Sequence, residues 1–479
     1  MTKLSKVFLL IGLMSGAVFT SAQNTTSSPY SRYGIGTLLS QDFMQNFAMG
    51  GTGIGMQSNR NINFDNPASY SALSITTFEA AFVNSALFLT DGAQTENLNY
   101  PSISYLSFGI PVMKDKWGMS FGLLPYSNLG YDYTHVVNDP LVGDITYFQK
   151  GNGGLTKAYL GNAIQINPKT NIDPLGLLLK PFAGPRYSIE TDSTGTEYRV
   201  YNKRIDSLIV HRKTPISFGF NGYFMFGNLT HDQKVIYGGL PNAQNLWVIQ
   251  RTAVADVGID FGMQYAKSYT VYKGNKVNRY KLALGATYAP GNGLKSKYTD
   301  MVRTFTGNND FGTIKDTISL IVEEPSTLDM PTEFGVGFSF QHINKWTFAV
   351  DYKMADWGAI STKSPLFQYN TNYSIAAGLE IIPKYDAFKG YFKRIAYRLG
   401  ARYNTSYVKV KGYDLPEYGI TFGMGLPMKR EQTAVPQLNL GFEYGKRGQT
   451  GDGLIEETFY RINVGITIND RWFIKRKYD

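Results

Sequence analysis

The chain has 479 residues, with 50 Gly, 34 Tyr and 30 Phe, only 18% charged residues, no cysteine and a formal net charge of +10. Without cysteine it can form no disulfide framework and carry no lipoprotein anchor. Beyond its first residues it has no run of about 18 consecutive apolar residues, which excludes an inner-membrane protein built from helices.

The first 22 residues have the form of a secretory signal peptide. Two lysines precede an apolar run, residues 7–19, and three small residues follow it up to Ala22. Such a run is too short to cross a membrane as a helix, and small residues mark a cleavage site. We therefore expect residues 1–22 to direct export and to be removed.

A glycine-rich segment, AMGGTGIGMQSNRNINFDNPASYSAL, follows at residues 48–73. Three of its glycines, Gly51, Gly53 and Gly55, follow the spacing Gly-x-Gly-x-Gly. A dinucleotide fingerprint has the spacing Gly-x-Gly-x-x-Gly, and Met56 stands where its third glycine is needed. An exported protein also meets few nucleotide cofactors. The segment therefore does not fit a nucleotide site.

From residue 74 onward, apolar and small polar residues alternate with a period of two. In PISFGFNGYFMFG, residues 215–227, large apolar side chains share one face, and mostly Ser, Gly and Asn occupy the other. Segments of about ten residues with this alternation are typical of transmembrane β-strands. We count about fourteen strands, near 74–89, 100–112, 116–126, 154–166, 215–228, 247–267, 278–290, 331–342, 345–357, 372–382, 394–405, 417–428, 435–446 and 458–468. The sequence therefore predicts an all-β protein. The even number of strands favours a closed antiparallel transmembrane barrel over residues 74–468.

The predicted connections differ in length at the two ends of the barrel. MKDK, HINK and MKREQTA are expected as short periplasmic turns, and the long segments 127–153, 229–246 and 291–330 are expected outside. Residues 167–214 break this pattern, because a short periplasmic turn is due there. Three interpretations stay open: a tolerated insertion with a hairpin from Glu197 to Val210, a docking element for a partner, or two more strands that make a barrel of sixteen.

The motif NFDNPAS and several later segments resemble the FadL/TodX family of outer-membrane channels for hydrophobic compounds. Asn66, Pro67 and Ala68 match the triplet that ends the family's N-terminal hatch. GLLPYSNLGY, LDMPTEFGVGFSF and WTFAVDYKMADW are similar to further segments, with Met330 in place of a leucine. The resemblance covers nearly the whole chain after the signal peptide. It departs from the family in the insertion and in a C-terminus without a final aromatic residue.

The resemblance implies a monomeric barrel of fourteen strands in the outer membrane, with residues 23–73 as a hatch, or plug, inside the lumen. The three spaced glycines and the Asn-Pro-Ala triplet would form this plug, since glycine backbone packs closely. The resemblance also implies a kinked third strand that opens a lateral path to the bilayer. Pro125 lacks an N–H group and is the expected gate residue, with an ordinary strand end as the alternative.

Charged residues of both signs would face the lumen if the large apolar side chains face lipid. The inward set includes Asp260, Lys281, Glu333, Asp351, Lys353, Arg398, Arg402 and Glu443. Such charges usually pair across a confined space or hold a plug. Alternatively, Lys281, Arg398 or Arg402 would bind a ligand carboxylate, for which arginine is well suited.

No catalytic residue, metal site or cofactor is expected. The four histidines lie far apart and form no zinc-binding spacing, and no nucleophile-elbow pattern occurs. The one dense basic patch lies in residues 469–479, a predicted periplasmic tail, and scattered lysines and arginines elsewhere argue against nucleic-acid binding.

Two functions fit these patterns. The first is an outer-membrane channel for passive uptake of hydrophobic or amphipathic molecules such as long-chain fatty acids. The alternative is a barrel subunit or scaffold of a larger outer-membrane secretion or assembly complex, with residues 167–214 or the basic tail binding a periplasmic or outer-membrane protein. A hydrophilic porin is the third and least favoured function, because the plug-like N-terminus argues against an open pore.

Overall fold

The computed structural model describes residues 28–166, 187–191, 195, 197–201, 207–211, 215–238, 240, 243–273, 276–307, 312–362, 367–428 and 435–470. The predicted signal peptide, most of the 167–214 insertion, and residues 471–479 of the predicted tail lie outside the described residues, whereas residues 469 and 470 of that tail belong to the last strand. Among the helices in these ranges, none has the length and apolar character needed to cross a membrane.

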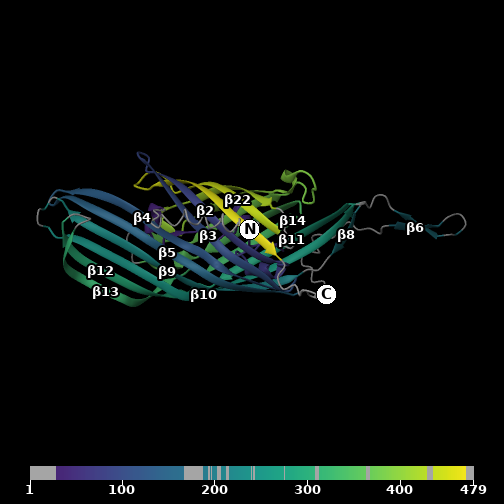
Figure 1. Ribbon diagram of the computed structural model, residues 1–479, viewed down its shortest axis with the longest axis horizontal. Helices are drawn as coiled ribbons and strands as arrows, with labels where there is room; N and C mark the ends of the chain where they lie inside the picture. Colours follow the sequence, from purple (N-terminus) through teal and green to yellow (C-terminus); the bar gives the residue numbers. More distant parts are fainter. Residues whose placement is uncertain are drawn as a thin grey trace, which may run out of the picture.

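A closed antiparallel barrel of 14 strands forms the body of the protein (Figure 1). Each strand pairs with the next along the chain, and the last strand pairs with the first. The strands are β2 (Thr76–Thr90), β3 (Thr95–Met113), β4 (Trp117–Asp139), β5 (Gly143–Ile166), β9 (Ile216–Tyr237), β10 (Asn245–Lys273), β11 (Lys276–Ala289), β14 (Glu333–His342), β15 (Trp346–Ala355), β17 (Asn372–Ile381), β18 (Ala396–Asn404), β21 (Glu417–Pro427), β22 (Val435–Arg447) and β23 (Glu456–Asp470). The predicted barrel of fourteen strands is confirmed, and the alternative of sixteen is excluded.

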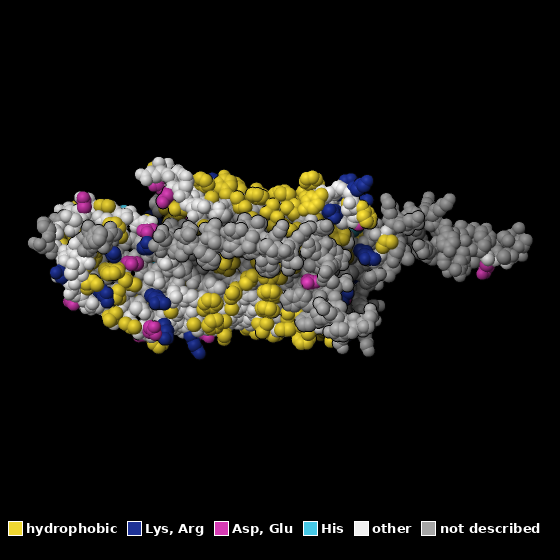
Figure 2. All heavy atoms as spheres, viewed as in Figure 1, with side chains coloured by type: hydrophobic (Ala, Val, Ile, Leu, Met, Phe, Trp, Pro, Cys, Tyr) yellow, Lys and Arg dark blue, Asp and Glu magenta, His cyan; other side chains and the backbone are white. Residues whose placement is uncertain are grey.

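The alternation seen in the sequence separates the two faces of the barrel wall. In β18, Leu399 points outward and is 53% exposed, whereas its neighbour Arg398 points inward and is 3% exposed. Hydrophobic side chains cover much of the barrel wall in Figure 2. An apolar outer band around a polar interior is the arrangement that a barrel in a bilayer requires.

The three segments predicted as outer loops are instead largely strands. β4 and β5 stay paired as far as Asp139 and Gly143, and β9 and β10 also continue past the predicted membrane-crossing length. Residues 291–330 form a hairpin of β12 (Gly293–Thr306) and β13 (Thr313–Asp329), and β12 pairs with β10. The predicted strands ended too early because an antiparallel ladder can continue in water, where the apolar alternation that marks lipid contact is no longer needed. The expectation that these segments lie outside stays a prediction.

Beyond the barrel, the ends of β4, β5, β9 and β10 form a sheet together with β12 and β13. We call this sheet the outer sheet. It projects from one end of the barrel in Figure 1. The other end, the short-turn end, carries the turns at residues 114–116 and 343–345 and the end of β23.

The described part of the insertion also lies at the short-turn end. β6 (Tyr187–Thr191) pairs with β7 (Glu197–Tyr201), and β8 (Ser207–His211) pairs with the end of β10 (Figure 1). The predicted hairpin from Glu197 to Val210 is therefore wrong. β7 takes its partner from the preceding residues, and β8 finds one in β10, which extends beyond β9 at this end.

Residues 28–75 run along the inside of the barrel before β2 begins. They contain three 3₁₀ or α-helical turns, η2 (Pro29–Arg32), α2 (Met44–Phe47) and η3 (Pro67–Ala72), and the two-residue strand β1 (Thr37–Leu38). Asn66 starts η3 because its side chain accepts a hydrogen bond from the Ala68 N–H group, with Pro67 at the first helical position. The Asn66 amide also donates to the carbonyl oxygen of Ile54, 2.9 Å away.

A ring of small residues on the inner wall receives this segment. Twelve strands present a glycine to residues 44–73: Gly109, Gly118, Gly161, Gly219, Gly262, Gly285, Gly337, Gly378, Gly400, Gly423, Gly441 and Gly465. The other two strands, β2 and β15, present Ala81 and Ala349, both 0% exposed. We call these fourteen positions the small-residue ring.

Contact at the small-residue ring is too close for larger side chains. A Cβ atom at Gly118 would lie 1.9 Å from the Tyr70 carbonyl oxygen, and one at Gly285 would lie 1.9 Å from that of Ile54. Residues 44–73 therefore touch the wall around its whole circumference at this level. The role of the segment as a hatch stays a prediction.

Replacing a ring glycine should loosen the N-terminal segment without unfolding the barrel. In Gly285→Ala the new methyl group must displace Ile54, so amide hydrogens of residues 44–73 should exchange faster with solvent, measured by hydrogen–deuterium exchange. Gly222→Ala is the matched control, because a Cβ atom there has only ordinary contact at 3.9 Å with the Leu160 carbonyl oxygen. Equal exchange in the two variants would contradict the importance of the ring.

Candidate functional site

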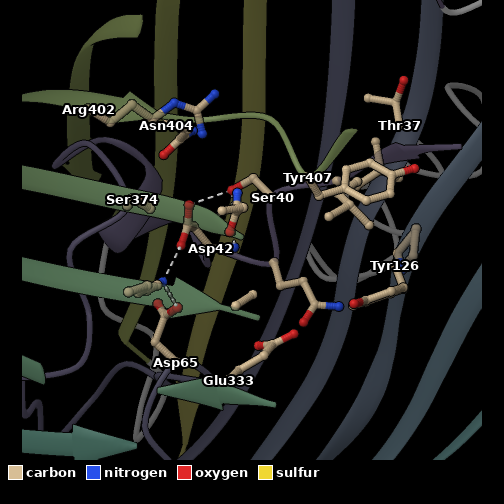
Figure 3. A pocket seen from close by; sticks show the side chains of 18 of the residues that line it. Thr37, Ser40, Asp42, Asp65, Tyr126, Glu333, Ser374, Arg402, Asn404 and Tyr407 are labelled. Atoms are coloured by element: carbon tan, nitrogen blue, oxygen red, sulfur yellow. Dashed lines mark hydrogen bonds and ion pairs between the residues drawn. The ribbon is translucent and has the colours of Figure 1, made fainter. Parts of the chain in front are cut away.

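A cavity of about 400 Å³ lies between the N-terminal segment and the outer sheet (Figure 3). Its floor includes Asp42 and Asp65 of the N-terminal segment, and its wall residues come from all fourteen barrel strands. On each of these strands, the lining residues lie on the outer-sheet side of the small-residue ring. The cavity is therefore a vestibule that ends at the N-terminal segment.

Polar groups of the wall hold the N-terminal segment from below the vestibule. The Asp351 carboxylate accepts hydrogen bonds from the backbone N–H groups of Gly53 at 2.5 Å and Ile54 at 2.7 Å. Ser339 donates to the Gly55 carbonyl oxygen at 2.7 Å. These side chains supply partners for backbone groups that cannot reach water.

The vestibule floor carries a lysine between two carboxylates. Lys353 Nζ of β15 lies 2.6 Å from Asp65 Oδ1 and 3.7 Å from Asp42 Oδ1 (Figure 3). The Asn46 amide donates to Asp65 Oδ2 at 2.9 Å. These contacts attach the N-terminal segment to the wall by charge as well as by packing.

A second lysine lies among aromatic rings on the other side of the vestibule. Lys157 Nζ of β5 lies 4.6 Å from the ring centre of Tyr126 and 4.4 Å from that of Tyr223. Asp260 Oδ2 lies 4.0 Å from the same nitrogen. Two ring faces and a carboxylate together compensate the buried ammonium group.

A network of six charged residues joins β18, β21, β22 and β23. Arg402 Nη2 lies 2.9 Å from Glu417 and 2.7 Å from Glu443, and Arg461 lies 3.0 Å from Glu443. Arg447 completes the network at 2.7 Å from Glu417 and 3.4 Å from Glu457. Each arginine has at least one carboxylate partner, as buried charges require.

The start of the described chain closes this network. Ser28 donates to the Glu457 carboxylate. The Tyr30 hydroxyl donates to the Ile455 carbonyl oxygen at 2.7 Å and accepts from the Ile455 N–H group at 2.8 Å. Burial raises the pKa of the Tyr30 hydroxyl to about 12, so it keeps its donor proton at neutral pH.

The three residues predicted to bind a ligand carboxylate lie on different sides of the small-residue ring. Only Arg402 lines the vestibule. Arg398 lies on the short-turn side, where its Nε is 2.7 Å from Glu380 Oε2 and its Nη1 is 3.1 Å from Asn439 Oδ1. Lys281 also lies on the short-turn side, four residues before Gly285 in β11. The structure does not bring the three together, and a ligand role for any of them stays a prediction.

Pro125 lies where the barrel wall changes its pairing. β3 and β4 pair only between Leu106/Leu123 and Met113/Trp117, and the β4–β5 register shifts between Pro125 and Ser127. Beyond Leu123, β1 pairs with β4 in the described chain, and Leu39 donates to the Tyr126 carbonyl oxygen at 2.9 Å. The N-terminal segment thus takes the place of β3 beside the vestibule, and a gating role for Pro125 stays a prediction.

The small-residue ring was missed in the sequence, although its signal was present as a glycine near the middle of most predicted strands. A glycine in a strand usually indicates a bulge or a close backbone approach. For metal binding, the part of the chain that the structure describes brings no three His, Asp or Glu side chains together in a way that could hold an ion.

Removing Arg398 should destabilise the barrel, because Glu380 would stay buried without its partner. Arg398→Ala should lower the free energy of unfolding by about 3–5 kcal/mol, the usual cost of breaking a buried ion pair. The measurement is urea-induced unfolding in lipid vesicles, followed by tryptophan fluorescence. Arg398→Met with Glu380→Gln should recover much of the loss, and a single variant as stable as the parent would contradict the pairing.

Comparisons with known proteins agree with this geometry. Among solved structures, the chain is similar to the TodX monoaromatic hydrocarbon channel deltaS2 mutant, with a TM-score of 0.51, 15% identity, and coverage of 91% of this chain and 99% of that chain. The TodX deltaS2S3 mutant monoaromatic hydrocarbon channel has a TM-score of 0.51 and 12% identity, with coverage of 90% of this chain and 99% of that chain. A Pseudomonas aeruginosa FadL homologue has a TM-score of 0.48 and 11% identity, with coverage of 91% of this chain and 99% of that chain.

These identities show the fold alone, so the predicted resemblance to FadL/TodX is confirmed as an outer-membrane barrel fold. The solved structures are transport channels and not enzymes. No curated protein matches the chain. The BamG family, by contrast, matches residues 3–174 and 201–479. Because this match covers most of the sequence, the chain belongs to the BamG family.

Proposed function

We propose that the protein is a sealed outer-membrane barrel that acts as a subunit of a larger outer-membrane assembly and passes no molecules through its lumen. The observation that carries this proposal is the small-residue ring, against which residues 44–73 pack on every side. A passage along the barrel axis would require the segment to leave contacts that only glycine and alanine allow.

The chemistry of the vestibule also favours this function over transport of hydrophobic compounds. Sites for apolar ligands are lined mainly by apolar and aromatic side chains with few polar groups. Here charged side chains of both signs line the cavity, among them Lys353 with Asp65 and Arg402 with Glu417. An apolar ligand would remove water from these ion pairs, and the lost hydration costs free energy that apolar contacts do not return.

The outer sheet offers a surface for a protein partner. In the described chain β13 pairs only with β12, so its second edge has backbone groups without a strand partner. Ile318 and Val322 of this strand are exposed. Exposed apolar edge strands are places where another chain can add to a sheet.

Native mass spectrometry tests the proposal directly. The tagged protein, purified from its own membranes in mild detergent, should carry a protein companion in fixed stoichiometry. A barrel that carries no protein companion would contradict the proposal.

Two variants would then locate the companion. Deletion of residues 174–205 removes most of the insertion but leaves β8 intact, and Ile318→Lys with Val322→Lys changes the edge of the outer sheet. Loss of the companion from one variant and not the other assigns the contact to that end of the barrel.

A channel with a lateral exit is the second candidate, favoured by the separation of β3 from β4 beside the vestibule. A ligand could leave there without crossing the small-residue ring. In that case, proteoliposomes with the protein should take up a fatty acid such as oleate faster than empty ones, and Arg402→Ala should slow uptake. Lys345→Ala is the control because this exposed residue lies in the turn at the short-turn end, beyond the ring. Uptake equal to that of empty liposomes would exclude the channel.

A further inference from the structure

We propose that residues 384–394, between β17 and β18, form a lipid anchor that binds anionic phospholipid headgroups in the membrane leaflet at the short-turn end. This inference depends on the barrel fold and is independent of the proposed function. We call these residues the anchor loop. Four basic side chains would meet the phosphates, and the aromatic side chains would enter the boundary with the acyl chains.

The anchor loop exposes aromatic rings far more than a loop in water would. Phe388 is 104% exposed and Phe392 is 74% exposed, and Tyr385 and Tyr391 are exposed as well. The outward-facing residues of the barrel wall meet lipid, but each is partly covered by its neighbours. Phe388 and Phe392 of the anchor loop instead have little cover from the rest of the protein.

Hydrogen bonds give the anchor loop a defined shape. The Lys384 N–H group donates to the Lys393 carbonyl oxygen at 2.7 Å and closes the loop, and Lys393 N–H donates to Gly390 at 3.1 Å. Gly390 has a φ of +87°, which favours glycine at this turn. Arg60 of the N-terminal segment donates to the Tyr385 hydroxyl at 2.6 Å. The rings are therefore presented by a folded loop.

The anchor loop lies where the barrel wall leaves the lipid. It joins the outward-facing Ile381 at the end of β17 to the start of β18, and Ile382 donates to Lys345 in the neighbouring turn at 2.7 Å. In Figure 1 this yellow-green segment projects from the side of the barrel near the short-turn end. Figure 2 shows hydrophobic side chains beside Lys and Arg side chains on this part of the surface.

The charge of the anchor loop selects the type of lipid. Lys384, Lys389, Lys393 and Arg394 stand against a single carboxylate, Asp386, which gives a net charge of +3 from four cations and one anion. Aromatic rings prefer the membrane interface, and nearby lysine and arginine are attracted to anionic headgroups. This mixture fits an anionic lipid surface better than an uncharged one.

Spin labels can measure the depth of the anchor loop, because the chain has no cysteine and a single introduced one is labelled without ambiguity. The label at Phe388→Cys, in nanodiscs containing phosphatidylglycerol, should be accessible to oxygen and protected from a water-soluble nickel complex. Leu399→Cys on the lipid-facing side of β18 is the membrane reference. Leu141→Cys, at a position 92% exposed in the turn between β4 and β5, is the water reference.

A label at residue 388 that behaves like the label at residue 141 would overturn the proposal. The charge is tested separately by changing the four basic residues of the anchor loop to glutamine. In native mass spectrometry from mixed phosphatidylglycerol and phosphatidylcholine, the parent should retain the anionic lipid preferentially, and the variant should lose about tenfold or more of this preference. The control changes Lys150, Lys234, Lys295 and Lys297 of the outer sheet to glutamine and should keep it.

An unchanged lipid preference in the anchor-loop variant would overturn the proposal. Both lipid measurements use the isolated full-length mature barrel. Anionic lipid retained by this barrel through the anchor loop therefore supports the anchor, whereas the proposed function is tested separately on the protein purified from its own membranes.

Discussion

Close packing between residues 44–73 and the inner wall is possible only because every barrel strand presents glycine or alanine at one level. Backbone then meets backbone, as at Gly400, where a Cβ atom would lie 2.2 Å from the Gly50 nitrogen. Interiors packed to this density leave little room for water or a ligand. The remaining features of the lumen follow from this closure.

Because the segment occupies the ring, the charges around it must find partners in the protein. Asp351 accepts from backbone N–H groups of the segment, and Lys353, two residues later in β15, pairs with Asp65. On the far wall, Arg402 shares two carboxylates. Most charges that the sequence places inside the lumen thus have structural partners, and their pairing fixes strands and segment to one another.

Periodicity alone was enough to predict the barrel, because outward apolar side chains are required wherever a strand meets lipid. The same rule failed beyond the bilayer, where β4, β5 and β12 continue without that requirement. The ion pairs could not be predicted, since Arg398 and Glu380 lie on neighbouring strands whose register depends on turns of unequal length. In the sequence, the small-residue ring was visible only as single glycines in separate strands. Whether these glycines lie at one level of the barrel depends on the same strand register.

Because residues 44–73 fill the middle of the barrel, the surfaces that could bind a partner or lipid lie on the outside of the molecule. The two ends differ there in chemistry: the outer sheet has a strand edge with exposed aliphatic residues, and the short-turn end has aromatic and basic residues. Edges suit other β-strands, whereas aromatic and basic side chains suit a membrane interface. Under the two proposals, a barrel fixed in the membrane at one end and open to protein contacts at the other would hold a partner in a defined orientation while residues 44–73 stay in place. A simple channel would not need this difference between its two ends, because the residues important for its function should line the path of its ligand.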